Sequence, residues 1–320
     1  MTMEKTLEIS NLEVSARDGK KSFAILRGIN LCAEPNQAVA LVGESGSGKT
    51  MTAMSVMRLL PRNLAVDRGR ILLRGEDILA MSESQMRHIR GKVASMIFQE
   101  PSSYLNPLFT VGSQVMEAVK NGEERFEKTM KMFEDVELER NVYFQYPHQL
   151  SGGMQQRVMI AMAMINNPAL LIADEPTTAL DVTTANGIVL LLRKMMDKYG
   201  LSVLFITHDM SLAASFAEKI GVMYAGRLVE FSDAAGIFKS PLHPYTEKLI
   251  DCLPERYAPG SRIRTVEGSV PDFRQLPGGC PFHLRCPYKI TLCTQRKPGP
   301  TLIGTTTVRC FKYGDDGQDS

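Results

Sequence analysis

The pattern of hydrophobic and polar positions changes its period several times along this chain. Several segments of the pattern predict short strands. Apolar and polar side chains alternate over residues 7–14, which is typical of a half-buried edge strand, and residues 22–32 predict a second strand. Apolar runs at residues 170–173 and 201–207 predict buried strands, and residues 69–73 and 92–98 predict two more. Helical segments separate these strands, so the pattern indicates an α/β fold.

Helical periodicity dominates the middle of the chain. Residues 111–119 and 123–133 predict two helices, and the stretch of about 100–165 predicts an inserted helical lobe. Another helix is expected from its N-cap at Asp181 through Tyr199, and residues 220–224 and 227–231 predict a hairpin. Beyond residue 240 proline and glycine become frequent and periodicity fades. We therefore expect a main domain at residues 1–240 and a small module at residues 241–320.

Bulk composition limits the class of protein. The 320 residues are 44% hydrophobic and 22% charged, as in ordinary globular proteins, and the net charge is +2. So small a charge gives no bulk attraction to nucleic acid or an anionic membrane. No apolar run approaches the ~18 residues of a spanning helix, and the N-terminus has no signal core. We expect a cytosolic or peripheral protein.

A glycine-rich turn lies between a predicted strand and a predicted helix in residues 37–60. The turn fills every fixed position of G-x-x-x-x-G-K-[ST], with the residues Gly43, Glu44, Ser45, Gly46, Ser47, Gly48, Lys49 and Thr50. Glycines let several backbone N–H groups converge on one anion, and the helix N-terminus adds its dipole. Lys49 would reach the terminal phosphates of a nucleotide, and the Thr50 hydroxyl suits Mg²⁺.

A second helix start also has the features of an anion site. Ser151, Gly152 and Gly153 open a predicted buried helix, and Ser151 is a good N-cap. Exposed N–H groups and the helix dipole favour a negative ligand there, as at the first turn.

Polar residues follow three predicted strands directly. Gln99 follows residues 92–98, Asp174 and Glu175 follow residues 170–173, and His208 follows residues 201–207. In open α/β sheets ligands bind at the carboxyl ends of strands. We expect Asp174 to hold Mg²⁺ and Glu175 to act on an attacking water as general base, while Gln99 can bind Mg²⁺ or a water.

The order of these motifs resembles that of the ATP-binding subunit of ABC transporters. The resemblance covers residues 7 to about 239 and implies a P-loop NTPase core with an antiparallel β subdomain and an inserted helical subdomain. It implies that Phe23, by itself more typical of a core residue, stacks on adenine. It implies catalysis by Lys49, Gln99, Glu175 and His208, with ATP and Mg²⁺ bound. Ser151, Gly152, Gly153 and Gln155 match the family signature, which contacts the nucleotide of a second subunit, and Asp181 matches the D-loop, where Thr178 replaces the usual serine.

The C-terminal part narrows the resemblance to the dipeptide, oligopeptide and nickel importer subfamily. Two sequence features show this resemblance: the His-Pro-Tyr-Thr run that begins at His243, and the cysteine tail. This subfamily implies an ATPase that energises peptide import, or import of nickel or a metal chelate, from the cytoplasmic side of the cell membrane. Its partners would be a sister ATPase chain, two transmembrane permeases and, indirectly, a substrate-binding protein. A soluble ABC-type ATPase acting on nucleic acid or ribosomes is the competing class, which the near-neutral charge disfavours, so we expect no nucleic acid.

Four cysteines lie close together in the C-terminal module. Their spacing is wider than in most zinc sites, and it fits an iron–sulfur cluster as well or better. A module this small also gains from a metal staple. A [4Fe–4S] cluster, zinc and unliganded thiols remain open for Cys280, Cys286, Cys293 and Cys310, and the tail of some peptide-importer ATPases, which this one resembles, implies the cluster.

Overall fold

The computed structural model describes residues 4–19, 21–119, 124–258 and 265–314. The chain forms two compact units, one of residues 1–7, 33–38 and 72–206 and the other of residues 8–32, 39–71 and 207–320. No helix that the structure describes combines the length and the apolar character that crossing a bilayer requires.

Parallel strands form the centre of the first unit. β6 (Ala94–Ile97) pairs with β7 (Leu170–Asp174), which pairs with β8 (Ser202–Thr207). All three strands are buried along their whole length, so both faces of each strand must be apolar, as in parallel sheets generally. The strands predicted from these apolar runs are confirmed.

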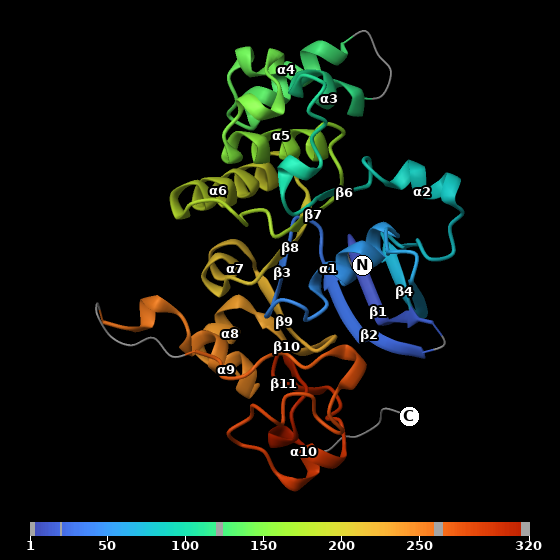
Figure 1. The fold of residues 1–320 in the computed structure, drawn as a ribbon, viewed down its shortest axis with the longest axis vertical. Coiled ribbons are helices and arrows are strands. Elements are labelled where there is room, and N and C mark those ends of the chain that lie inside the picture. Colours follow the sequence, from blue (N-terminus) through green and yellow to red (C-terminus); the bar gives the residue numbers. More distant parts are fainter. Residues whose placement is uncertain (1–3, 20, 120–123, 259–264, 315–320) are drawn as a thin grey trace. The chain divides into compact units, whose positions relative to one another are not determined.

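Helices of the first unit form a lobe, drawn in green in Figure 1. It contains α3 (Val111–Ala118), α4 (Arg125–Asp135) and α5 (Gly152–Met164), with 3₁₀ turns η1 (Pro101–Ser103), η2 (Arg140–Phe144) and η3 (Pro147–Gln149). Thr110 caps α3, and a Cβ at Gly112 would lie 2.2 Å from the ring of Tyr143, so α3 and η2 pack closely. The two predicted helices are confirmed, although Glu123 lies outside the described residues.

Two further helices of the first unit have simple local causes. α2 (Glu83–Ile89) begins with a capping box between Ser82 and Gln85, and α6 (Val182–Tyr199) begins at the predicted N-cap Asp181 and ends at Gly200 in a left-handed conformation. β5 (Glu76–Asp77) is a two-residue strand.

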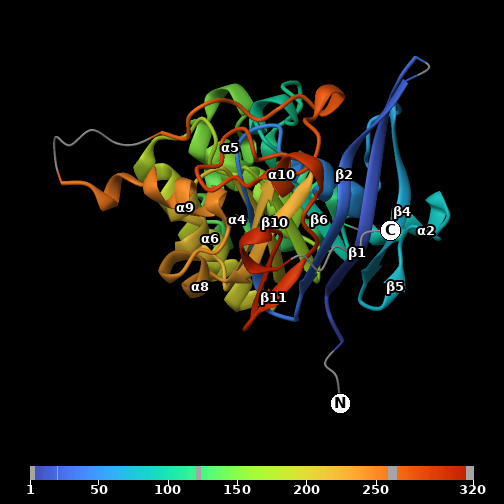
Figure 2. The same ribbon diagram turned by 90° about the horizontal axis from the view of Figure 1, so that it is seen from below.

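One sheet of the second unit corrects a prediction. β1 (Leu7–Asp18) lies between β2 (Lys21–Ala33) and β4 (Leu64–Leu73), as Figure 2 shows. The expectation of an edge strand was therefore wrong. Alternation reports that one face is buried, and it does not report whether a strand has one neighbour or two.

The other sheet of the second unit holds the glycine-rich turn. β3 (Ala38–Val42) pairs in parallel with β9 (Lys219–Tyr224), and β9 forms the predicted hairpin with β10 (Arg227–Asp233). β12 (Thr306–Val308) adds to β10, and β11 (Thr301–Ile303) adds to β12. The C-terminal module thus extends this sheet, which the sequence pattern did not predict. The remaining elements are α1 (Lys49–Met57), α7 (Met210–Phe216), α8 (Ala234–Lys239), α9 (Pro244–Asp251), η4 (Pro254–Arg256), η5 (Phe273–Gln275), α10 (Thr291–Gln295) and η6 (Phe311–Tyr313).

Candidate functional site

The glycine-rich turn connects the end of β3 to the start of α1, as the sequence predicts. Gly43 has φ +150° and Gly48 has φ +106°, values that side chains rarely permit. A Cβ at Gly43 would lie 2.3 Å from the Met223 carbonyl oxygen of β9. Position 43 therefore requires glycine, because the backbone conformation disfavours a side chain and the Met223 carbonyl oxygen leaves no room for a Cβ.

The polar groups of this turn fit a phosphate ligand. The Nζ of Lys49 donates hydrogen bonds to the carbonyl oxygens of Gly43 (2.7 Å) and Glu44 (3.1 Å), and its side chain is buried. The Ser47 hydroxyl is buried and has no hydrogen-bond partner within the described part of the chain. A buried hydroxyl without a partner is costly unless a ligand satisfies it. The donors fit a triphosphate, and Thr50, the next residue of α1, would supply an oxygen to Mg²⁺.

Phe23 lies in β2 and is half-buried, in the same unit as the glycine-rich turn. Its role in stacking on adenine stays a prediction.

Three of the predicted strand-end residues share one sheet edge in the first unit. Ile97 of β6 pairs with Ala173 of β7, so Gln99, Asp174 and Glu175 all lie at the carboxyl ends of neighbouring parallel strands. Asp174 is 3% exposed, whereas Gln99 is exposed. His208 directly follows β8 and is exposed, and it belongs to the second unit.

Glu175 is held by its backbone and by its carboxylate. Its φ is +47°, a left-handed conformation that is rare outside glycine, and its N–H donates to the Ile206 carbonyl oxygen at 2.9 Å. The Thr178 hydroxyl donates to Oε2 of Glu175 at 2.9 Å. The role of Glu175 as a general base stays a prediction.

The second helix start is accessible in the first unit. Ser151 caps α5 by accepting from the Met154 N–H at 3.4 Å, and Ser151 and Gly152 are exposed. The Gln155 amide donates to the carbonyl oxygens of Pro147 (2.9 Å) and Leu150 (3.4 Å). Gln155 therefore anchors the preceding turn to α5 and holds the helix start in place.

Thr184 of α6 connects this helix start to Asp181. A Cβ at Gly153 would lie 2.6 Å from Cγ2 of Thr184. The backbone N–H and hydroxyl of Thr184 donate to the Asp181 carboxylate at 3.0 and 2.6 Å, and these bonds lower the pKa of Asp181. Gly153 and Asp181 thus contact the same threonine.

Two residues that sequence reasoning missed contact the glycine-rich turn. The Glu44 N–H donates to the Tyr245 hydroxyl at 3.0 Å, and the Arg285 guanidinium donates to both carboxylate oxygens of Glu44 at 2.7 and 3.0 Å. These partners are 201 and 241 residues from Glu44 along the chain, so no local pattern could reveal them.

Known proteins share both the motifs and the fold. Residues 26–178 match the family described as ABC transporter. The dipeptide transport ATP-binding protein DppD of Bacillus subtilis is 41% identical over 97% of this chain and 95% of its own length. The chain belongs to the ABC transporter family. A putative peptide import ATP-binding protein of Brucella ovis is 40% identical to this ABC transporter chain over 93% of it and 94% of the relative.

Solved structures bear out the core of the fold. The dimeric ATP-binding cassette MJ0796 in a post-hydrolysis state with ADP and Pi has a TM-score of 0.64 and 29% identity to this ABC transporter chain. The match covers 71% of this chain and 98% of that one. A second neighbour, cbiO1 of Clostridium perfringens, has a TM-score of 0.65 at 24% identity, covers 74% of this chain and 92% of that one, and shows the fold alone. The P-loop ABC ATPase fold predicted from the motifs is confirmed.

Residues 229–293 of this ABC transporter chain match a second family, described as the oligopeptide/dipeptide transporter C-terminal region. The predicted membership of the dipeptide and oligopeptide subfamily is thereby confirmed. The matched segment contains the His243 run and the first three cysteines of the tail, Cys280, Cys286 and Cys293.

The four cysteines of the tail line one cavity of about 160 Å³. Burial raises the pKa of Cys280 to about 12 and also raises the pKa of Cys310, so these thiols are protonated at neutral pH. No group of three or more histidine, cysteine or acidic side chains in the described residues is arranged to hold a metal ion. The predicted cluster or zinc site thus has no support beyond the shared cavity.

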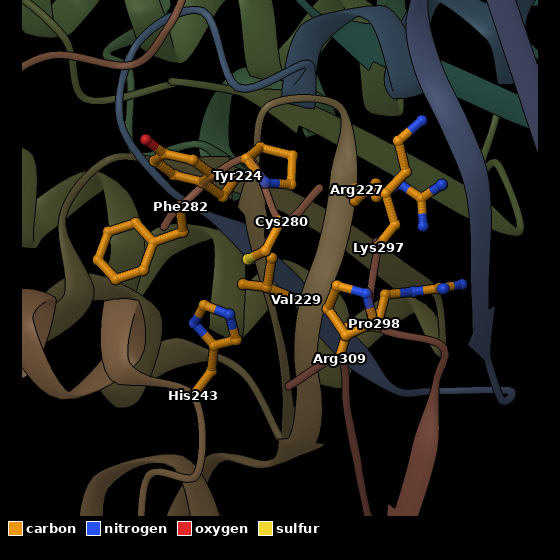
Figure 3. Close-up of a pocket in the computed structure, with 10 residues that line it drawn as sticks. Tyr224, Arg227, Val229, His243, Cys280, Phe282, Lys297, Pro298 and Arg309 are labelled. Carbon is orange, nitrogen blue, oxygen red and sulfur yellow. The ribbon is translucent and has the colours of Figure 1, made fainter. Parts of the chain in front are cut away.

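A smaller pocket of about 20 Å³ adjoins this cavity (Figure 3). Cys280, Phe282 and His243 line both spaces, and Tyr224 lines the smaller pocket. Tyr224 meets Phe282 edge to face, with ring centroids 5.2 Å apart. Phe282 therefore lines the cysteine cavity and also packs against Tyr224 at the end of β9.

Proposed function

We propose that this chain is the ATP-hydrolysing subunit of an ABC importer that carries peptides across the cytoplasmic membrane. The single observation that carries the proposal is the complete phosphate-binding turn, in which the buried Ser47 hydroxyl lacks a protein partner within the described residues. Two relatives at 40–41% identity are named as a peptide import and a dipeptide transport ATP-binding protein, which supports peptides as the substrate class.

The predicted site residues have distinct chemical roles in ATP hydrolysis. Lys49, which now donates to two carbonyl oxygens of its own loop, would transfer these hydrogen bonds to phosphate oxygens. Thr50 in the second unit and Gln99 and Asp174 in the first are the Mg²⁺ ligands that the family resemblance implies, and the cation would neutralise phosphate charge. Glu175 orients water and accepts its proton, and His208 would stabilise the charge that develops on the γ-phosphate.

The exposed start of α5 supports a second ATPase chain as a partner. Ser151 and Gly152 present a helix N-terminus to solvent, where a phosphate bound by another chain can reach it. The cassette MJ0796 is described as dimeric. A sister chain rather than a second copy is our expectation, because the subfamily that this chain resembles pairs different ATPases.

The helical lobe and residues 146–149 are the proposed contact with the membrane partner, which in the complex is made of two permease subunits. Leu108 is 78% exposed and Phe144 is 67% exposed, with Phe109 and Tyr146 also exposed. Large contiguous apolar patches mark protein interfaces, so these exposed apolar side chains support the proposal if they gather on one face of the lobe. The chain would thus be a peripheral protein of the inner membrane, and a substrate-binding protein would join through the permeases.

Co-purification tests this function. The full chain with an affinity tag should retain two membrane permease chains in detergent, and its ATPase should rise with peptide in the reconstituted complex and vanish in Lys49→Ala. Stimulation by DNA or RNA in place of peptide would favour a soluble nucleic-acid ATPase. Stimulation by a nickel chelate would favour the metal importer.

We also propose domain limits of 1–240 and 241–320, with the helical subdomain at about 100–165.

For the cysteine cavity we propose a bound [4Fe–4S] cluster, with zinc as the alternative. This proposal is supported by the position of the four thiols, which all line that one cavity. Iron, sulfide and zinc analysis of anaerobically purified protein should give iron and sulfide in equal amounts for a [4Fe–4S] cluster. Absence of all three would leave the cysteines as unliganded thiols.

A further inference from the structure

Glu44 places a carboxylate inside the phosphate-binding turn. It directly follows Gly43 and precedes the helix start at Lys49 by five residues. A nucleoside triphosphate carries several negative charges, so an uncompensated carboxylate at this position opposes its binding. The chain therefore needs a positive group beside Glu44.

Arg285 of the C-terminal module supplies that positive group. Its two terminal nitrogens donate to the two carboxylate oxygens of Glu44, and its side chain is only 6% exposed. Two parallel charge-assisted hydrogen bonds of this kind are stronger than hydrogen bonds between neutral groups and also fix the geometry. Although burial lowers the pKa of Arg285, its bonds to Glu44 and Tyr224 outweigh burial, and the net shift is upward.

Residues of the module and Tyr224 of β9 hold Arg285 in this geometry. Its Nε donates to the Glu267 carbonyl oxygen at 2.8 Å, and its guanidinium lies 5.7 Å from the ring centroid of Tyr224. Its own carbonyl oxygen accepts from Lys248 of α9 at 2.9 Å. The arginine is thus fixed before any ligand arrives, so it loses little freedom by pairing with Glu44.

Tyr245 of α9 fixes the backbone of the same residue. Its hydroxyl accepts the Glu44 N–H at 3.0 Å, and its fully buried ring packs against Tyr224 and Phe282. Backbone and side chain of Glu44 are therefore both bound by the C-terminal module.

We propose that Arg285 is a positioning residue for ATP: by neutralising Glu44 it sets the affinity of the phosphate-binding turn for the triphosphate. The C-terminal module thus contributes to nucleotide binding through Glu44, in addition to any role of its cysteines. The inference rests on the proposed assignment of residues 43–50 to ATP.

Neutralising Arg285 and neutralising Glu44 should have different effects on ATP affinity. Arg285→Gln leaves the Glu44 carboxylate without its counter-charge, so ATP should bind about tenfold more weakly at low ionic strength, with a smaller loss for ADP. Glu44→Gln removes the repelling charge, so ATP should bind as tightly as in the wild type or more tightly. The double variant should return to within about twofold of the wild type.

Isothermal titration calorimetry of the full chain with ATP and ADP, at low and high salt, measures these effects. Arg274→Gln is the matched control, because Arg274 pairs with Asp272 at 2.7 Å in the same module but is exposed. A purely structural role of the ion pair would instead weaken binding in both single variants, equally for ATP and ADP, and leave the double variant unrescued.

These outcomes separate the inference from the proposed function. If the wild type and Arg274→Gln fail to bind ATP, the assignment of the phosphate-binding turn is wrong. If both bind ATP and Arg285→Gln binds it equally well, only the role of Arg285 is wrong. Should Arg285→Gln fail to fold, Glu44→Gln still decides, since weakened ATP binding in that variant would overturn the inference.

Discussion

The hydroxyl of Thr178 donates a hydrogen bond of 2.9 Å to Oε2 of Glu175. The backbone N–H of Glu175 also donates to the Ile206 carbonyl oxygen, so Thr178 holds one oxygen of a carboxylate whose backbone is already fixed. Threonine stands where the family usually has serine, and both residues carry the hydroxyl. The proposed general base is therefore oriented by a residue of the loop that leads to Asp181.

Glu175→Gln should abolish turnover while preserving nucleotide binding. The amide keeps an oxygen for Thr178 but cannot accept a proton from water, so steady-state phosphate release should fall by about 10²–10⁴-fold. Light scattering with ATP should then detect a long-lived dimer. Glu139→Gln, at an exposed position of the lobe, is the control. Normal turnover in Glu175→Gln would refute the assignment of the base.

Thr178→Ala should lower kcat with little change in KM. Loss of one hydrogen bond to the carboxylate is worth about 1.5 kcal/mol, which corresponds to roughly a tenfold slower step. Thr178→Ser retains the hydroxyl and should remain near the wild-type rate. Equal rates for the alanine and serine variants would show that this hydrogen bond does not orient Glu175.

Gly153→Ala should disturb the start of α5 because the added Cβ would lie 2.6 Å from Cγ2 of Thr184. We expect ATPase activity to fall several-fold while ATP binding by the monomer persists, since α5 is proposed to serve the partner's nucleotide. Thr184→Ser removes Cγ2 and keeps the hydroxyl that bonds Asp181. Gly153→Ala/Thr184→Ser should therefore recover activity, and an unrescued double variant would place the defect elsewhere.

His243 should make the protein sensitive to mild acid. Complete burial lowers the pKa of His243 from 6.5 to about 3, and its Nδ1 accepts the Tyr245 N–H at the start of α9. Between these two pH values the unfolded chain binds a proton that the folded chain does not, so stability falls as pH falls, by up to ~1.4 kcal/mol per pH unit.

Urea unfolding at pH 7.5 and 5.5 measures this effect. His243→Asn keeps an N-cap acceptor and removes the titrating group, so it should lose less stability than the wild type between the two pH values. Glu230, which accepts the His243 N–H, is present in both proteins and contributes equally. The same pH dependence in both proteins would show that His243 is not the sensitive group.

Local features of the fold could be predicted from the sequence. The strand of residues 170–173 was recognisable because a parallel strand buried on both faces must be apolar, and the turn after β3 because only glycine permits the conformation of Gly43. Helix caps such as Ser151 and Asp181 were recognisable because each bonds to a backbone N–H only three residues along the chain.

Long-range relationships could not be predicted. The central place of β1 and the pairing of Glu230 with Val308 depend on partners that no local period encodes. The same holds for Arg285, which sequence reasoning passed over because it lies in weakly periodic sequence beside Cys286. Cysteine spacing indicated that the four thiols would gather, and they line one cavity, but spacing does not determine their mutual geometry.

The pairing of β12 with β10 has a consequence for how such proteins can be shortened or recombined. Glu230 and Phe231 of β10 have their ladder partners in Val308 and Thr307. Ending the chain at residue 240 would leave that strand with a bare row of backbone donors and acceptors, which invites self-association into insoluble material. A hybrid built from two relatives should therefore exchange β10 and the C-terminal tail together, as one inherited piece.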